Sequence, residues 1–72
     1  MINIRENLTL KACRYIADIK AAEIASDVGV SVNTLYKWES GELHPNGEQM
    51  ARIVHCFANR GYAIDVNDIN FF

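Results

Sequence analysis

The sequence lacks the features that mark membrane, secreted and disordered proteins. No apolar run approaches the roughly 20 residues needed to cross a bilayer. Residues 1–13 alternate apolar and polar side chains and lack the apolar core of a signal peptide. Charged residues make up 22% of the chain and hydrophobic residues 50%, which is typical of a globular protein and not of a disordered one. These absences predict a cytoplasmic globular protein.

Cysteine is scarce, since Cys13 and Cys56 are the only two, and this excludes a disulfide scaffold. Each lies among apolar positions of a helical pattern, so we expect buried, reduced thiols that pack as small hydrophobic side chains. A zinc site would need His44 and His55 as further ligands. His55 and Cys56 are adjacent, about 100° apart on a helix, and there is no CxxC or HxxxH pair. We therefore expect no metal and no other cofactor.

Positive charge is also scarce, because the net charge is −2. This argues against a strong grip on nucleic acid that ignores base sequence. The charges are unevenly spread: residues 1–40 are neutral, and the acidic excess lies in residues 41–72. The distribution of charge matters more than its sum, so binding to nucleic acid through the first 40 residues stays open.

With four glycines and one proline, the chain has few breaks. Its 72 residues fit one domain, residues 1–72, with a small core. The segments between the breaks have a helical period and predict five short helices with no strand. The N-caps of the first, third, fourth and fifth helices are expected at Asn7, Ser31, Asn46 and Asp65. Residues 61–65 have some β character but are too short to pair.

The apolar positions predict which face of each helix is buried. In the first helix, which runs to about Ala17, the inward positions are Leu10, Cys13, Ile16 and Ala17. The second helix covers about residues 21–28 and ends at Gly29, where a left-handed conformation suits glycine. The last helix is expected to turn Val66, Ile69 and Phe72 inward.

One spacing in the second and third helices carries the functional information. Counted from Ala21, the fifth residue is Ala25, small enough for two helices to cross closely, and the ninth is Gly29, which suits a left-handed turn. The wedge between the two helices is filled by Ile24, Val28, Val30, Leu35 and Trp38. This spacing predicts a helix-turn-helix over about residues 21–40, whose second helix enters the DNA major groove.

Across about Leu8 to Ile69, the chain resembles the phage-repressor (Cro and XRE-type) helix-turn-helix family. The matching pieces are IASDVGVSVNTLYKWESG, the proline of ELHP, MARIVHCFA and IDVNDI. A specific part of the signature is Trp38, Glu39 and Gly41, followed by Pro45. The resemblance implies an all-α, lambda-repressor-like DNA-binding domain, built as a bundle of five short helices, with double-stranded DNA as its partner.

The resemblance also implies an ion pair between Arg14 and Glu39 that clamps the third helix onto the bundle; the alternative is that both side chains are solvated. Two positions depart from the family pattern. The family often has glutamine, which bonds phosphate, where this chain has Ala21, and often a basic loop where this chain has Glu42. We therefore expect weak phosphate anchoring, to which Lys20 contributes.

The outer edge of the third helix is predicted to contact DNA, since several of its residues share the face opposite the buried one. The candidate DNA-binding residues are Lys20, Ser31, Val32, Asn33, Thr34, Tyr36, Lys37 and Ser40. Asn33 suits adenine, Lys37 suits guanine or phosphate, and Val32, with no apparent partner, suits a thymine methyl. Tyr36 offers a hydroxyl to phosphate and a ring to a sugar or base. The alternative is a solvated face.

These features predict a sequence-specific, Cro-like transcriptional regulator of phage or prophage origin, associated with the nucleoid when bound. Weak anchoring favours a homodimer on two half-sites; Phe71 and Phe72 either contact the second copy or fold back on the core. The alternative function is a protein-interaction module on the same fold, antitoxin-like or an adaptor domain. No catalytic constellation converges, so we predict no enzyme activity, no small-molecule ligand and no membrane partner.

Overall fold

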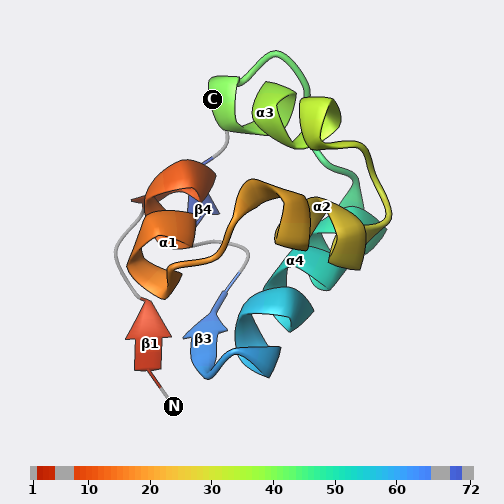
Figure 1. The fold of residues 1–72 in the computed structure, drawn as a ribbon. Helices are drawn as coiled ribbons and strands as arrows, with labels where there is room; N and C mark the ends of the chain where they lie inside the picture. Colours follow the sequence, from red (N-terminus) through yellow and green to blue (C-terminus); the bar gives the residue numbers. More distant parts are fainter. Residues whose placement is uncertain (1, 5–7, 66–68, 71–72) are drawn as a thin grey trace.

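Four helices and four short strands make up the computed structural model, which describes residues 2–4, 8–65 and 69–70 (Figure 1). The helices are α1 (Leu10–Ala17), α2 (Ala21–Val28), α3 (Val32–Ser40) and α4 (Gly47–Asn59). The strands are β1 (Ile2–Ile4), β2 (Leu8–Thr9), β3 (Tyr62–Ile64) and β4 (Ile69–Asn70). Within these ranges, no helix is long and apolar enough to cross a membrane. The described part of the chain is mostly helical.

Within the helix-turn-helix unit, the end of α2 and both ends of α3 lie at the predicted capping residues. Ser31 accepts a hydrogen bond from the backbone N–H of Thr34 through its side-chain oxygen at 3.2 Å, which caps α3. Gly29 ends α2 and Gly41 ends α3, both left-handed with φ of 86° and 85°. The predicted capping box at the start of α4 is also present, between Asn46 and Gln49. These predictions are confirmed.

The prediction of no strand was wrong. β1 pairs in parallel with β3, in the register Ile2 to Tyr62, and β2 pairs in parallel with β4, in the register Leu8 to Ile69. The segment at residues 61–65 therefore does pair, because the other end of the chain supplies its partner.

The first and fifth helices also differ from the prediction. Thr9, not Asn7, caps α1 and accepts a hydrogen bond from the N–H of Ala12 at 3.1 Å, since the residues just before α1 form β2. Where the fifth helix was expected after Asp65, the described residues Ile69–Asn70 form β4. The predictions for Val66, Phe71 and Phe72 lie outside the described residues.

The core gathers buried side chains from all four helices and from β3 and β4. In it α2 packs against α3 and α4, and α4 packs against β3. Its largest fully buried side chains are Phe57, Leu10, Ile24, Leu35 and Ile53. Burying each contributes roughly 1.5–3 kcal/mol to stability. Cys13 and Cys56 are both buried and form no disulfide, as predicted. Ile16 does not share the buried face of α1: it is 50% exposed, and Arg14 is buried instead, at 8% exposure.

Candidate nucleic-acid interface

The inner face of α3 is held by two buried side chains. Leu35 is fully buried and Trp38 is 2% exposed. The turn that leads into α3 is tight, because the N–H groups of Gly29 and Val30 both donate to the carbonyl of Ala25, at 2.9 and 3.0 Å. Since α2 packs directly on α3, this turn fixes the angle at which α3 leaves α2.

An ion pair joins α1 to the last turn of α3. The Arg14 Nε–H donates to Glu39 Oε2 at 2.8 Å, and Arg14 Nη1 donates to the carbonyl of Ile19 at 3.3 Å. The two side chains are only 10% and 7% exposed. The hydrogen bond to Glu39 is the main cause that raises the pKa of Arg14 above its ordinary value. The structure therefore brings together the two residues of the expected pair, at a site nearly closed to water.

The outward face of α3 is hollowed. A depression of about 390 Å³ is lined by Asn33, Tyr36, Lys37, Ser40 and Glu42. All five are exposed, Tyr36 to 50%. Four of them are predicted contact residues, which the structure gathers around one hollow.

Glu42 is the member of this hollow that sequence reasoning missed. It was treated as a loop charge that weakens phosphate anchoring. The chain reverses at Gly41, whose N–H donates to the Trp38 carbonyl at 3.4 Å, and Glu42 then lies beside the outer face of α3. The signal that it belongs there is its distance from the C-cap glycine, since a residue directly after a left-handed cap stays near the last turn.

The serine and threonine hydroxyls of the predicted set form hydrogen bonds within α3 and its N-cap. Ser31 Oγ and Thr34 Oγ1 lie 3.0 Å apart at the start of the helix, and Ser40 Oγ donates to the Lys37 carbonyl at 3.2 Å. These bonds hold the hydroxyls in place at the two ends of the outer face.

Two other predicted residues lie at the margins of this face. Val32 is partly buried and packs against the hydrophobic core, so the premise that its side chain has no partner was wrong. Lys20 is exposed at the N-cap of α2, and its carbonyl accepts a hydrogen bond from the N–H of Ile24 at 3.3 Å. Lys20 therefore lies directly before the first residue of the helix-turn-helix.

In the described residues, the arginines are ion-paired and the lysines are not. Each arginine there is ion-paired: besides Arg14, Arg52 lies 2.8 Å from Glu48, and Arg60 lies 2.9 Å from Asp27. The three lysines, Lys11, Lys20 and Lys37, form no ion pair with any residue in residues 2–4, 8–65 and 69–70. Among the described residues, the lysine and arginine side chains without an ion pair are therefore the lysines.

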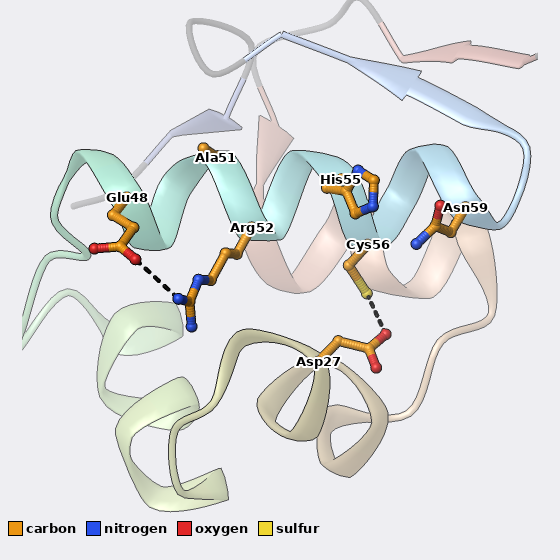
Figure 2. A pocket seen from close by; sticks show the side chains of 7 residues that line it. All are labelled: Asp27, Glu48, Ala51, Arg52, His55, Cys56 and Asn59. Carbon is orange, nitrogen blue, oxygen red and sulfur yellow. Dashed lines mark hydrogen bonds and ion pairs between the residues drawn. The ribbon is translucent and has the colours of Figure 1, made fainter.

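A second hollow, of about 350 Å³, lies between α2 and α4 (Figure 2). The side chains that line it are Asp27, Glu48, Ala51, Arg52, His55, Cys56 and Asn59. The Cys56 thiol donates to Asp27 Oδ2 at 3.2 Å, and Arg60 Nη1 donates to the same oxygen at 2.9 Å and to the sulfur at 3.0 Å. These polar groups satisfy one another.

Burial, with the nearby Asp27 carboxylate, raises the pKa of Cys56 to about 12, so the thiol stays protonated at neutral pH and is a poor nucleophile. The hydrogen bonds from Cys56 and Arg60 lower the pKa of Asp27. In the part of the chain that the structure describes, no group of three or more His, Cys, Asp and Glu side chains is placed to hold a metal ion. At this hollow, α2 is therefore connected to α4 by the hydrogen bonds that Asp27 accepts.

Comparison with known proteins identifies the family. The sequence model of a family described as "Helix-turn-helix" matches residues 10–58, from the start of α1 to near the end of α4. Comparison with curated proteins and with solved structures found no match. The match covers the helix-turn-helix formed by α2 and α3 and the two helices that support it. The chain therefore belongs to the Cro/C1-type (XRE) helix-turn-helix family of DNA-binding regulators.

Proposed function

We propose that this protein is a sequence-specific transcriptional regulator that places α3 in the major groove of double-stranded DNA. The observation that carries the proposal is the two-sided construction of α3. Its inner face is held by Leu35 and Trp38 and by the pair between Arg14 and Glu39, while its outer face presents exposed polar side chains around a hollow. A helix fixed on one side and polar on the other is suited to contacting base edges.

Each outward residue has a chemical role in this proposal. The Asn33 amide forms two hydrogen bonds with adenine, and the Lys37 ammonium donates to guanine O6 or N7. The Tyr36 hydroxyl binds phosphate and its ring packs on a sugar or base. The exposed part of Val32 contacts a thymine methyl.

The phosphate backbone is held at the ends of the two helices. Ser31 and Thr34 lie at the N-terminus of α3, where free N–H groups favour an anion. Lys20 binds phosphate at the start of α2, and Ser40 binds it at the far end of the outer face. Because few cations are available, each copy binds weakly, and two copies bind two half-sites about one helical turn apart. Occupying the groove then either blocks or recruits polymerase.

Selection of binding sites from random duplex DNA tests this function. The expected result is enrichment of a half-site that contains adenine and guanine, in two copies. Asn33→Ala and Lys37→Ala should each weaken binding to the selected site by roughly 1–3 kcal/mol. Asn59→Ala is the matched control, since Asn59 is exposed on α4 and lines the other hollow. No enrichment at low salt would refute the proposal and favour the protein-interaction module.

A further inference from the structure

An exposed aromatic ring on α1 lies beside two cations. Tyr15 is 65% exposed, the largest value among the exposed large hydrophobic side chains of the described residues. Its ring centroid lies 5.8 Å from Lys11 Nζ and 5.1 Å from Arg14 Cζ. Both distances are within the range of cation–π attraction, which favours keeping the ring and the cations together. We call these three residues the α1 strip.

The α1 strip is joined to α3 through the pair between Arg14 and Glu39. Arg14 is bonded to Glu39 in the last turn of α3, so its guanidinium lies between the two helices. Tyr36 lies three residues before Glu39 on α3, so the two side chains share one side of that helix. The pair between Arg14 and Glu39 therefore links Tyr15 on α1 to the side of α3 that carries Tyr36.

The chemistry of the α1 strip matches a phosphodiester. Lys11 is exposed and forms no ion pair with the residues that the structure describes, so its ammonium is available to an anion. The Tyr15 hydroxyl, four residues along the same helix, adds a hydrogen-bond donor beside it. A second copy of the chain fits this surface less well, because a two-fold contact would place the two Lys11 side chains near each other.

We propose that Lys11 and Tyr15 form a second contact with the DNA backbone, outside the stretch of bases that α3 contacts. The Lys11 ammonium and the Tyr15 hydroxyl bind a phosphate that flanks the half-site, and Arg14 holds the Tyr15 ring in place. This inference rests on the proposed function, because α3 in the major groove sets where the flanking backbone runs. It gives the duplex a contact on α1 that compensates for the acidic loop at Glu42.

The salt dependence of binding tests the contact directly. Each phosphate neutralised adds roughly 0.9 to the slope of log affinity against log salt, which is about fivefold in affinity at 0.15 M salt. Lys11→Gln should therefore weaken binding about fivefold for every duplex sequence and reduce the slope by about one. Lys11→Arg should restore both. Tyr15→Phe should lower affinity a few-fold with an unchanged slope, because it removes a hydrogen bond and no charge.

Two controls separate a local contact from a general effect of charge. Arg52→Gln removes one positive charge from α4, at the other hollow, and should leave the slope unchanged. A duplex trimmed to the selected half-sites should bind wild type and Lys11→Gln equally, since the flanking phosphate is gone. Lys11 and Tyr15 are exposed, so the variants should fold, which circular dichroism checks.

The outcomes distinguish this inference from the proposed function. If Lys11→Gln keeps the wild-type slope and affinity while Asn33→Ala still weakens specific binding, the α1 contact is wrong and the proposed function stands. If wild type binds no duplex at low salt, both are wrong. If the Lys11 and Tyr15 variants alter the monomer–dimer equilibrium in sedimentation while binding to a single half-site is unchanged, the α1 strip contacts a second copy and the inference is overturned.

Discussion

Removing one member of the Arg14–Glu39 pair should destabilise the protein strongly. With the two side chains only 10% and 7% exposed, Arg14→Met would leave the Glu39 carboxylate buried without its partner. The loss of one partner from a buried pair costs roughly 3–5 kcal/mol. A domain of 72 residues has a total stability of about 4–11 kcal/mol, at 0.05–0.15 kcal/mol per residue. The single variant should therefore lose a large part of its stability.

Removing both charges should restore most of that loss. In Arg14→Met/Glu39→Leu, no charge is left buried, and replacing a buried pair with apolar side chains of similar volume is often neutral. We expect the double variant to lie within about 1 kcal/mol of wild type. Because each single variant should cost roughly 3–5 kcal/mol, the coupling energy in the double-mutant cycle should be at least about 5 kcal/mol. Because Trp38 is 2% exposed, its fluorescence reports unfolding in urea.

The same double-mutant cycle can contradict this expectation. If each single variant costs less than about 1 kcal/mol and the coupling energy is close to zero, the pair behaves as a solvated surface pair. The orientation of α3 would then depend on Leu35 and Trp38 alone. Equal m-values for all four proteins are needed, since a changed m-value would signal a different unfolded state.

Three further predictions follow from single positions. The pKa of Cys56 is raised from 9.0 to about 12, so this thiol ionises at lower pH in the unfolded state than in the folded state. The free energy of unfolding should therefore fall as pH rises from 9 toward 12. Cys56→Ala should remove this part of the fall in urea titrations, and a variant with the wild-type pH profile would contradict the prediction. Gly29→Ala should cost roughly 1–2 kcal/mol at a φ of 86°, whereas Gly47→Ala, where an added Cβ meets nothing within 4 Å, is the neutral control in thermal melts. Glu42→Gln should raise affinity for all duplexes a few-fold without changing the selected site, because it removes a negative charge near the phosphates; a changed base preference would show instead that Glu42 contacts a base.

The elements predicted correctly are those specified by neighbouring residues. Ser31 and Asn46 cap helices through hydrogen bonds to residues three positions on, and Gly29 and Gly41 take a left-handed conformation that a side chain would strain. These are local rules, so the sequence alone reveals them. They place α2, α3 and the start of α4.

Long-range partners account for the errors. The β character of residues 61–65 was visible, but nothing near them in the sequence identifies residues 2–4 as their partner. In α1 the buried stripe is Leu10, Cys13, Arg14 and Ala17, which has the regular helical spacing. Hydrophobicity alone favoured Ile16 over Arg14, because the carboxylate that makes burial of an arginine tolerable lies 25 residues away, on α3.

The site itself divides in the same way. The spacing along α3 was enough to select Asn33, Tyr36, Lys37 and Ser40 as one face. It could not show that Glu42 closes their hollow, because that depends on how the chain reverses after the helix. Nor could it show that Tyr15 is linked to α3, since the link runs through the pair between Arg14 and Glu39.

The parallel pairing of the two ends of the chain has a consequence for how the protein folds. Ile2 pairs with Tyr62 and Thr9 with Asn70, so each strand pair closes a loop of about 60 residues. Forming contacts this distant along the chain costs loop-closure entropy before the contacts stabilise the protein. Folding is therefore slower than that of a bundle of helices with local contacts. During synthesis, α1 to α4 can form before β3, the partner of β1, has been made. The strand pairs can therefore assemble only after residues 62–64 and 69–70 have been made.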